Sequence, residues 1–256
     1  MTRRHVNFDC EGSACVGTVD VAPGTTGLLI VSGGNELRSG AWNGQALLTR
    51  AVAAAGYPAF RFDRRGVGDS DGSNAGFGSG GVDIAAALVA FRAEVPQLTR
   101  IVAFGNCDGA TALMLASGKG CDGLILSNPW TIEGDDDRPP PAAVRSHYAQ
   151  RLKNPKAMLR LLKGKVSISG LIGSLRDALK PAPARSSLAA EVAAGLDAFA
   201  GPVAILLAGR DRTAQVFEAG WDKADPRIQR CAAAGHSYVE AQDWLLARIV
   251  EELGRA

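Results

Sequence analysis

The sequence predicts an α/β fold, in which helices flank a mostly parallel central sheet and a helical insertion interrupts the second half of the chain. Short β-rich runs alternate with helical patterns up to residue 130, and the alternation resumes at residue 201. Parallel strands joined by right-handed helical crossovers give this order of elements. Between the two stretches, prolines interrupt the helical patterns and no run of comparable strand character occurs. We therefore expect one sheet with an inserted cap.

The strands and helices are placed by these runs and by the residues that end them. An opening hairpin is expected over residues 6–8 and 16–21, with its turn near Gly12. Further strands are predicted at residues 28–31, 59–62, 101–104, 123–126 and 203–207, with a short one around Ile228. Helical patterns occupy residues 42–55, 82–95, 110–117 and 239–253. Gly56 ends the first of these helices and Pro96 follows the second.

Chain length limits the number of domains. The 256 residues accommodate one large α/β domain with a modest insertion, and we do not expect two full domains. We assign residues 1–130 and 201–256 to the core and residues 131–200 to the helical cap.

Composition and charge exclude several classes of protein. A net charge of +2 is too small for a nucleic-acid footprint over the whole surface. The first residues include two arginines but no apolar stretch follows them, so they do not form a secretory signal. No apolar run approaches the length that spans a bilayer. We expect a cytoplasmic protein without a transmembrane segment and without a nucleic-acid partner.

The cysteines are odd in number and widely scattered. They are Cys10, Cys15, Cys107, Cys121 and Cys231, and no two form a Cys-x-x-Cys pair. This spacing disfavours both a disulfide framework and a zinc site, and reduced thiols are the default for a cytoplasmic protein. The sequence therefore predicts no metal and no cofactor.

One cysteine stands in a pattern that indicates a nucleophile. Residues 105–109 read Gly-Asn-Cys-Asp-Gly and lie between a predicted strand and a predicted helix, which is the setting of a nucleophile elbow. The two glycines permit a sharp turn, and a helix N-terminus favours the thiolate form of a cysteine. The alternative is that Cys107 is a small buried residue at a strand end. The other four cysteines lack this setting and are expected to serve packing.

A thiol nucleophile needs a base, and the base needs a group that orients it. His236 follows the last predicted strand, where this pattern places its catalytic histidine, whereas His5 lies in the first strand and His147 in the cap. Asp211 lies between Cys107 and His236 in the chain, just beyond the strand that follows the cap. We expect Asp211 to hold the imidazole, and the alternative role is a helix N-cap.

Acyl transfer also requires donors for the developing oxyanion. One expected donor is the backbone N–H of Asp108, directly after the nucleophile. The other is expected from Gly34 or Asn35, in the turn after the first central strand. Glycine pairs also occur as plain turns, so this element supports the assignment without deciding it.

Several motifs resemble those of a known superfamily. Residues 63–70, Asp-Arg-Arg-Gly-Val-Gly-Asp-Ser, resemble the Asp-x-Arg-Gly-x-Gly-x-Ser loop of the α/β-hydrolase superfamily, and the resemblance covers nearly the whole chain. Residues 105–110, 128–130, 148–155 and 161–164 are similar to the type 1 hydrolase associated with the exosortase A system. With cysteine in place of serine at the nucleophile position, the chain also resembles dienelactone hydrolases. The long basic cap and the Cys-Asp pair fit that group less well.

The closer resemblance implies a hydrolase encoded in exopolysaccharide and protein-sorting loci of Gram-negative bacteria, without defining its reaction. Within the matching runs, we expect Trp130, Tyr148 and Arg151 to contact the substrate.

The predicted cap is strongly basic. Nine Lys or Arg residues and no Asp or Glu lie between Arg138 and Arg176. One interpretation is a solvated charged face; the other is a lid that attracts an anionic substrate. The expected substrate is accordingly a small-molecule or carrier-bound acyl group, and an anionic one under the second interpretation.

The sequence favours an acyl hydrolase that cleaves an ester or thioester through an acyl-cysteine intermediate. An acyltransferase using the same triad is one alternative. A non-catalytic binding protein of the exopolysaccharide locus is another. The presence of nucleophile, acid and base in the expected chain order argues against this last alternative.

Overall fold

The fold is described from a computed structural model, which covers residues 2–133 and 187–255. Its centre is an eight-stranded sheet with the strand order β1-β2-β4-β3-β5-β6-β7-β8. Only β1 with β2 and β2 with β4 pair antiparallel; the remaining pairs of this sheet are parallel. The strands are β1 (Thr2–Cys10), β2 (Ser13–Val21), β3 (Thr26–Val31), β4 (Ala59–Phe62), β5 (Arg100–Asn106), β6 (Gly123–Ser127), β7 (Val203–Ala208) and β8 (Ile228–Cys231). The predicted mostly parallel sheet is confirmed.

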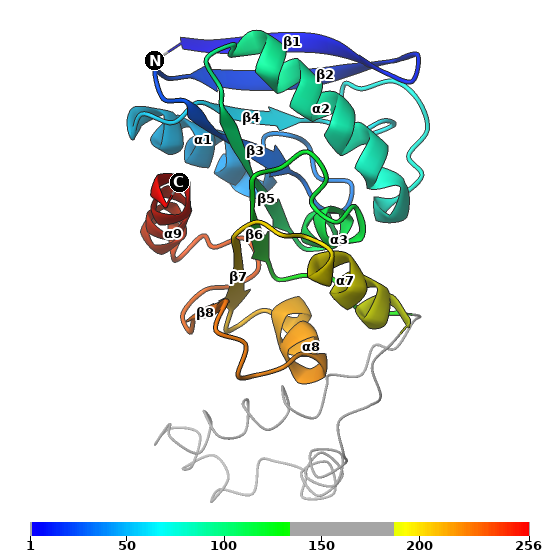
Figure 1. Ribbon diagram of the computed structural model, residues 1–256, viewed down its shortest axis with the longest axis vertical. Coiled ribbons are helices and arrows are strands. Elements are labelled where there is room, and N and C mark those ends of the chain that lie inside the picture. The colour runs from blue at the N-terminus through cyan, green and yellow to red at the C-terminus, as the bar shows by residue number, and fades with distance from the viewer. Residues whose placement is uncertain (1, 134–186, 256) are drawn as a thin grey trace, which may run out of the picture.

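Helices cover both faces of the sheet (Figure 1). Helices α1 and α9 pack on one face, and α2, α3, α7 and α8 pack on the other. The helices are α1 (Gly44–Ala54), α2 (Gly80–Glu94), α3 (Asp108–Leu115), α7 (Ser187–Asp197), α8 (Arg212–Gly220) and α9 (Gln242–Gly254), with short 3-10 turns η1 (Ala41–Asn43) and η2 (Phe77–Ser79). Both faces of the sheet are therefore buried.

Strand β3 shows why the central strands read as continuous apolar runs. Successive side chains of a strand point to opposite faces. Leu29 and Val31 accordingly join the core under α2 and α3, whereas Leu28 and Ile30 join the core under α1 and α9. A strand covered on both faces has no position where a polar side chain reaches water, so its apolar run is unbroken.

The observed helices begin later than predicted where residues have positive φ angles. Trp42 and Asn43 have φ angles of 49° and 63°, so the regular helix α1 begins at Gly44. Tyr238, with φ of 54°, is followed by turns, and α9 begins only at Gln242. Such φ angles lie outside the α-helical region. Helix α8 was not among the predicted helices, although a helix N-cap was the alternative role considered for Asp211.

Helix α7 falls within the residues predicted to form the cap. Its buried side chains Val192 and Leu196 belong to the same core cluster as α2 and α3. Most of the predicted cap lies outside the described residues, so the division into core and cap stays a prediction.

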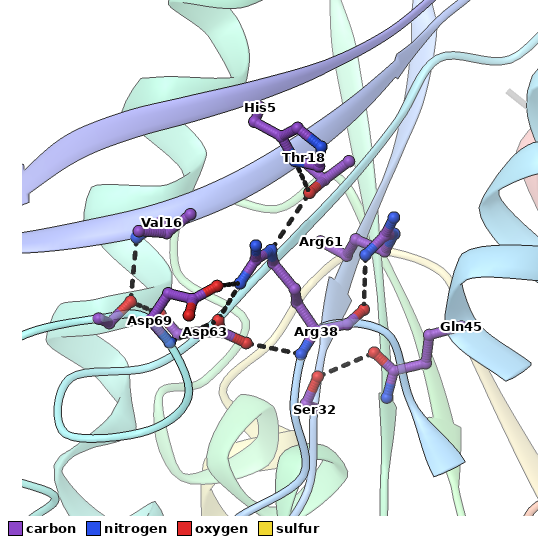
Figure 2. Close-up of polar contacts among 10 residues, drawn as sticks. His5, Val16, Thr18, Ser32, Arg38, Gln45, Arg61, Asp63 and Asp69 are labelled. Atoms are coloured by element: carbon purple, nitrogen blue, oxygen red, sulfur yellow. Dashed lines mark hydrogen bonds and ion pairs between the residues drawn. The ribbon is translucent and has the colours of Figure 1, made fainter. Parts of the chain in front are cut away.

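A polar network fixes the loop that leaves β3 (Figure 2). Asp63, fully buried after β4, accepts the backbone N–H of Arg38 at 2.6 Å and also pairs with the Arg38 guanidinium. The same guanidinium bonds Asp69 at 2.8 Å and Thr18 at 3.2 Å. Arg61 donates to the carbonyl of Arg38 at 3.0 Å. Residues of the 63–70 motif thus hold the loop that runs past the carboxyl end of the sheet.

This network predicts unequal effects for two aspartates that share one arginine. Asp63→Ala leaves Arg38 partly buried without its inner partner, and breaking such a pair costs ~3 kcal/mol of unfolding free energy. Asp69, whose side chain is 71% exposed, serves as the matched control, and Asp69→Ala is expected to cost less than ~1 kcal/mol. Urea unfolding of both variants measures the difference. Equal losses would contradict the inner position of Asp63.

Candidate active site

The chain makes a strained turn between β5 and α3. Cys107 joins the two elements with φ of 60° and ψ of −128°, a conformation that costs a residue with a side chain of the order of 1–3 kcal/mol. A Cβ on Gly105 would lie 2.6 Å from backbone atoms of Gly109 and Ala110, and one on Gly109 would overlap the carbonyl oxygen of Val31. Only glycine fits at both positions, and the turn lifts Cys107 to the carboxyl end of the sheet.

His236 and Asp211 approach this turn from the far end of the chain. The Nδ1 atom of His236 lies 3.0 Å from Oδ2 of Asp211. The same oxygen accepts the backbone N–H of Ala214 at 3.1 Å and so caps the N-terminus of α8. Both roles that the sequence left open for Asp211, partner of the histidine and helix cap, are present in one carboxylate.

The histidine is electrostatically coupled to both neighbours. The hydrogen bond to Asp211 and a second one with the Cys107 side chain raise the pKa of His236 to about 10, against the opposing effect of burial. The imidazole and the carboxylate are thus in direct contact, and the Cys107 thiol lies near enough to act on the imidazole. This arrangement can move a proton between the thiol and the imidazole while the carboxylate stabilises the imidazolium.

Two asparagines hold the backbone that carries the histidine. Asn128, fully buried after β6, donates to the side-chain oxygen of Asn106 at 2.9 Å, and both amides donate to the His236 carbonyl at 3.3 Å. The side-chain oxygen of Asn128 accepts the N–H of Ala208 at 2.8 Å. Sequence reasoning gave these residues no role. An amide directly after a buried strand, at the edge where parallel strands end, is the signal that could have found Asn128.

Tyr238 anchors the same loop two residues further on. Its ring is 2% exposed and stacks on Trp244 with centroids 6.0 Å apart. Its hydroxyl forms a 3.0 Å hydrogen bond with Ser127. The position of the imidazole therefore depends on buried contacts on both sides of it.

The turn after β3 reaches the nucleophile, as expected for a source of oxyanion donors. A Cβ on Gly33 would lie 3.2 Å from Cβ of Cys107. The backbone N–H of Gly34, one of the expected donors, donates to the carboxylate of Asp108. An oxyanion would therefore compete with the Asp108 side chain for this donor.

Trp130 contacts the elbow through its backbone, whereas Asn35 contacts Asn74. The backbone N–H of Trp130 donates to the carbonyl of Cys107 at 3.3 Å, and its carbonyl accepts the hydroxyl of Thr111 at 2.7 Å. The side chain of Asn35 accepts a 2.7 Å hydrogen bond from Asn74. Trp130 thus supports the elbow through its backbone, whatever its side chain contributes.

Other expected features cannot be placed. Tyr148, Arg151 and the basic segment 138–176 lie outside the described residues.

Three of the other thiols are poor nucleophiles. Burial and a hydrogen bond to Asp83 raise the pKa of Cys10 to about 12, and burial also raises that of Cys15. Burial raises the pKa of Cys121 to about 12. A thiol with a raised pKa carries little thiolate at neutral pH. The environment at these positions agrees with the packing role predicted for them.

The fold and these motifs define a class. A family model described as the alpha/beta hydrolase family matches residues 28–248, and the chain belongs to this family. A search of curated proteins gives no match. The closer resemblance to the exosortase-associated type 1 hydrolases therefore stays a prediction.

Solved structures share the fold at low sequence identity. The esterase Pf2001 of Pyrococcus furiosus matches with a TM-score of 0.64 and 14% identity, over 99% of this chain and 90% of that one. A serine hydrolase homologue from Coxiella burnetii matches with a TM-score of 0.60 and 17% identity, over 99% of this chain and 98% of that one. A thioesterase domain from the curacin biosynthetic pathway matches with a TM-score of 0.56 and 14% identity, over 98% of this chain and 100% of that one.

Among residues 2–133 and 187–255, we find no helix with the length and apolar character of a membrane span.

The His236 pair predicts a pH-dependent stability. The pKa of His236 in the folded chain, about 10, lies above the ordinary 6.5, so the pair stabilises the fold fully below pH 6.5 and this stabilisation is lost as the pH rises through 10. Asp211→Asn removes the charge and keeps a residue suited to capping α8. We expect wild type to exceed this variant by up to ~1 kcal/mol in unfolding free energy near pH 6, where the imidazole is protonated and the carboxylate is ionised. Urea unfolding across this pH range tests it; a constant difference would contradict the pairing.

Proposed function

We propose that this chain is an acyl hydrolase that cleaves an ester or thioester through an acyl intermediate on Cys107. The observation that carries the proposal is the 3.0 Å pair of His236 with Asp211 beside Cys107, which stands at a strained strand-to-helix turn. Membership of a hydrolase family and the similarity to an esterase and a thioesterase domain support the reaction class.

In the first half of the reaction, His236 takes the proton of Cys107 and the sulfur attacks the carbonyl carbon of the substrate. A C–S bond forms and the carbonyl oxygen becomes an oxyanion. The bond to the leaving oxygen or sulfur then breaks, and His236 returns its proton to that atom. Asp211 stabilises the imidazolium in between. The raised pKa of His236, about 10, means that the imidazolium formed in this step is stabilised at neutral pH.

In the second half, water attacks the acyl-cysteine. His236 takes a proton from the water, the C–S bond breaks, and the sulfur of Cys107 leaves with the electron pair and recovers the proton. An acyltransferase would follow the same steps with a hydroxyl acceptor in place of water. Product analysis distinguishes the two, since only the hydrolase releases a free acid.

The backbone N–H groups of Asp108 and Gly34 are the proposed oxyanion donors. The first lies at the start of α3 and the second in the turn after β3, where the N–H of Gly34 contacts the Asp108 side chain. The N-terminus of a helix stabilises negative charge, which adds to the first donor. The second donor becomes available when the Asp108 carboxylate releases it.

The biological setting remains part of the proposal. A cytoplasmic location is expected from the sequence, and a place in an exopolysaccharide and exosortase locus is what the family resemblance implies. An anionic acyl substrate follows only if segment 138–176 attracts the substrate and is not simply a solvated face.

Acylation of Cys107 is the direct test. Incubation with small acyl thioesters followed by intact and peptide mass spectrometry is expected to place one acyl group on Cys107. Cys231, also partly exposed, is the internal comparison. His236→Ala should slow acylation by ~10²-fold or more, the usual contribution of a general base, and Cys107→Ala should abolish it. Acyl groups spread over several thiols, or placed first on Cys231, would refute the assignment.

The side chain of Asp108 gives a second prediction. Asp108→Ala keeps the backbone donor of residue 108 and frees the N–H of Gly34. A single oxyanion donor is worth ~10²–10³ in kcat, and we expect removal of its competitor to recover about 10-fold in acylation rate. Asp108→Asn, whose amide oxygen can still accept from Gly34, is the matched control and should stay near wild type. A correctly folded Asp108→Ala variant no faster than wild type would mean that the carboxylate does not compete.

A further inference from the structure

A pocket lies beside the proposed reaction centre, on the face of the sheet covered by α1 and α9. It has a volume of about 140 Å³. Its apolar walls include Trp42, Leu48, Ala51, Phe104, Leu245 and Leu246. The catalytic steps proposed above do not use any of these side chains.

The pocket adjoins the reaction centre through two lining residues. Asn106 directly precedes Cys107, and Ser237 directly follows His236. One end of the pocket is therefore formed by the chain neighbours of the proposed nucleophile and base. A group of the substrate that occupies the pocket would lie close to the bond that is cleaved.

The lining discriminates against negative charge. Of the described residues that line the pocket, Glu36 and Asp243 are acidic and none is Lys, Arg or His. The oxygens of Glu36 already accept from the N–H of Ala41 at 2.6 Å and from Gln45 at 2.7 Å. An anionic group would lose its hydration here and find no counter-charge.

The pocket also leaves apolar surface exposed to water. Trp42 is 38% exposed and Leu47 is 46% exposed, and both line it. The hydrogen bond from Ala41 to Glu36 fixes the turn that carries Trp42, so this wall is already in place before a ligand binds. Covering such surface with an apolar group is favourable.

We propose that this pocket binds an uncharged apolar group of the substrate, either a short aliphatic chain or a single aromatic ring. The proposal rests on the acyl hydrolase function and specifies its substrate class. If the substrate also carries an anionic group, that group is expected to lie outside the pocket.

Two alanines on α1 provide a matched pair of variants for the test. Ala51 lines the pocket, and Ala54 is exposed on the same helix. Ala51→Phe fills the pocket, while Ala54→Phe adds the same ring to the surface. Urea unfolding first establishes that both variants fold. Leu48→Ala, which enlarges the pocket, is the second variant, and it should shift the preference of the enzyme towards larger groups.

Two substrate series compare rates of acylation. N-acetylcysteamine thioesters with acetyl and hexanoyl groups vary the acyl side, and methyl and phenyl thioacetate vary the leaving side. In one of the two series, we expect Ala51→Phe to reduce kcat/KM for the larger substrate by about 10-fold, a size discrimination typical of apolar pockets. The kcat/KM for the smaller substrate of that series should stay unchanged. Ala54→Phe should resemble wild type throughout. The affected series identifies the group that the pocket holds. Indistinguishable Ala51→Phe and Ala54→Phe variants in both series would overturn the proposal.

A binding measurement separates the pocket from the catalytic function. Titration with 1-hexanol, followed by tryptophan fluorescence, should show saturable binding to wild type and to Ala54→Phe, and none to Ala51→Phe. Saturable binding without acylation of Cys107 by any thioester would overturn the proposed function and leave the pocket intact. Acylation of Cys107 without hexanol binding and without size preference would overturn the pocket and leave the function intact.

Discussion

The positive φ of Cys107 is the constraint on which the rest of the site depends. A residue in this conformation can neither continue β5 nor begin a regular helical turn, so its side chain leaves the sheet at the point where β5 ends. The conformation persists because Gly105 and Gly109 pack against backbone atoms with no room for a side chain. The strain is local, and close packing of β5, α3 and β3 offsets it. A rigid scaffold thus presents a small thiol where loops from other strands gather.

The residues around the thiol come from distant parts of the chain, and buried polar contacts hold them. Asp63 and Arg38 fix the loop after β3, while Asn128 and Asn106 fix the backbone at His236. Buried polar groups of this kind must be satisfied or they destabilise the fold, which makes their geometry specific. The two networks hold two different segments of the chain. One positions the proposed oxyanion donors and the other positions the proposed base.

Sequence reasoning found the features that local patterns encode. The unbroken run of β3 and the glycine spacing around Cys107 reflect constraints that act within a few residues, and both predicted their elements. The order of Cys107, Asp211 and His236 along the chain follows from the topology of a parallel sheet. Their contact in the structure agrees with it.

What it missed depends on contacts between residues far apart in the sequence. Asn128 and Asn106 are 22 residues apart, and Asn128 bonds the carbonyl of His236 across 108 positions. No periodicity marks such a pair. Helix α8 was missed because sequence reasoning weighed a histidine partner against an N-cap for Asp211 and did not define the helix that such a cap would begin. The contact of the Asp108 side chain with Gly34 spans 74 positions and likewise has no local signature.

The double use of one oxygen of Asp211 links two events that look unrelated. The atom that pairs with His236 also closes the first turn of α8 through Ala214. Because one atom makes both contacts, they are coupled, and the coupling acts in both directions. Fraying of the α8 N-terminus frees the carboxylate to move and weakens its hold on the imidazole. Conversely, each gain or loss of the imidazole proton changes how firmly the helix begins. The stability of the first turn of α8 thus depends on the charge state of His236.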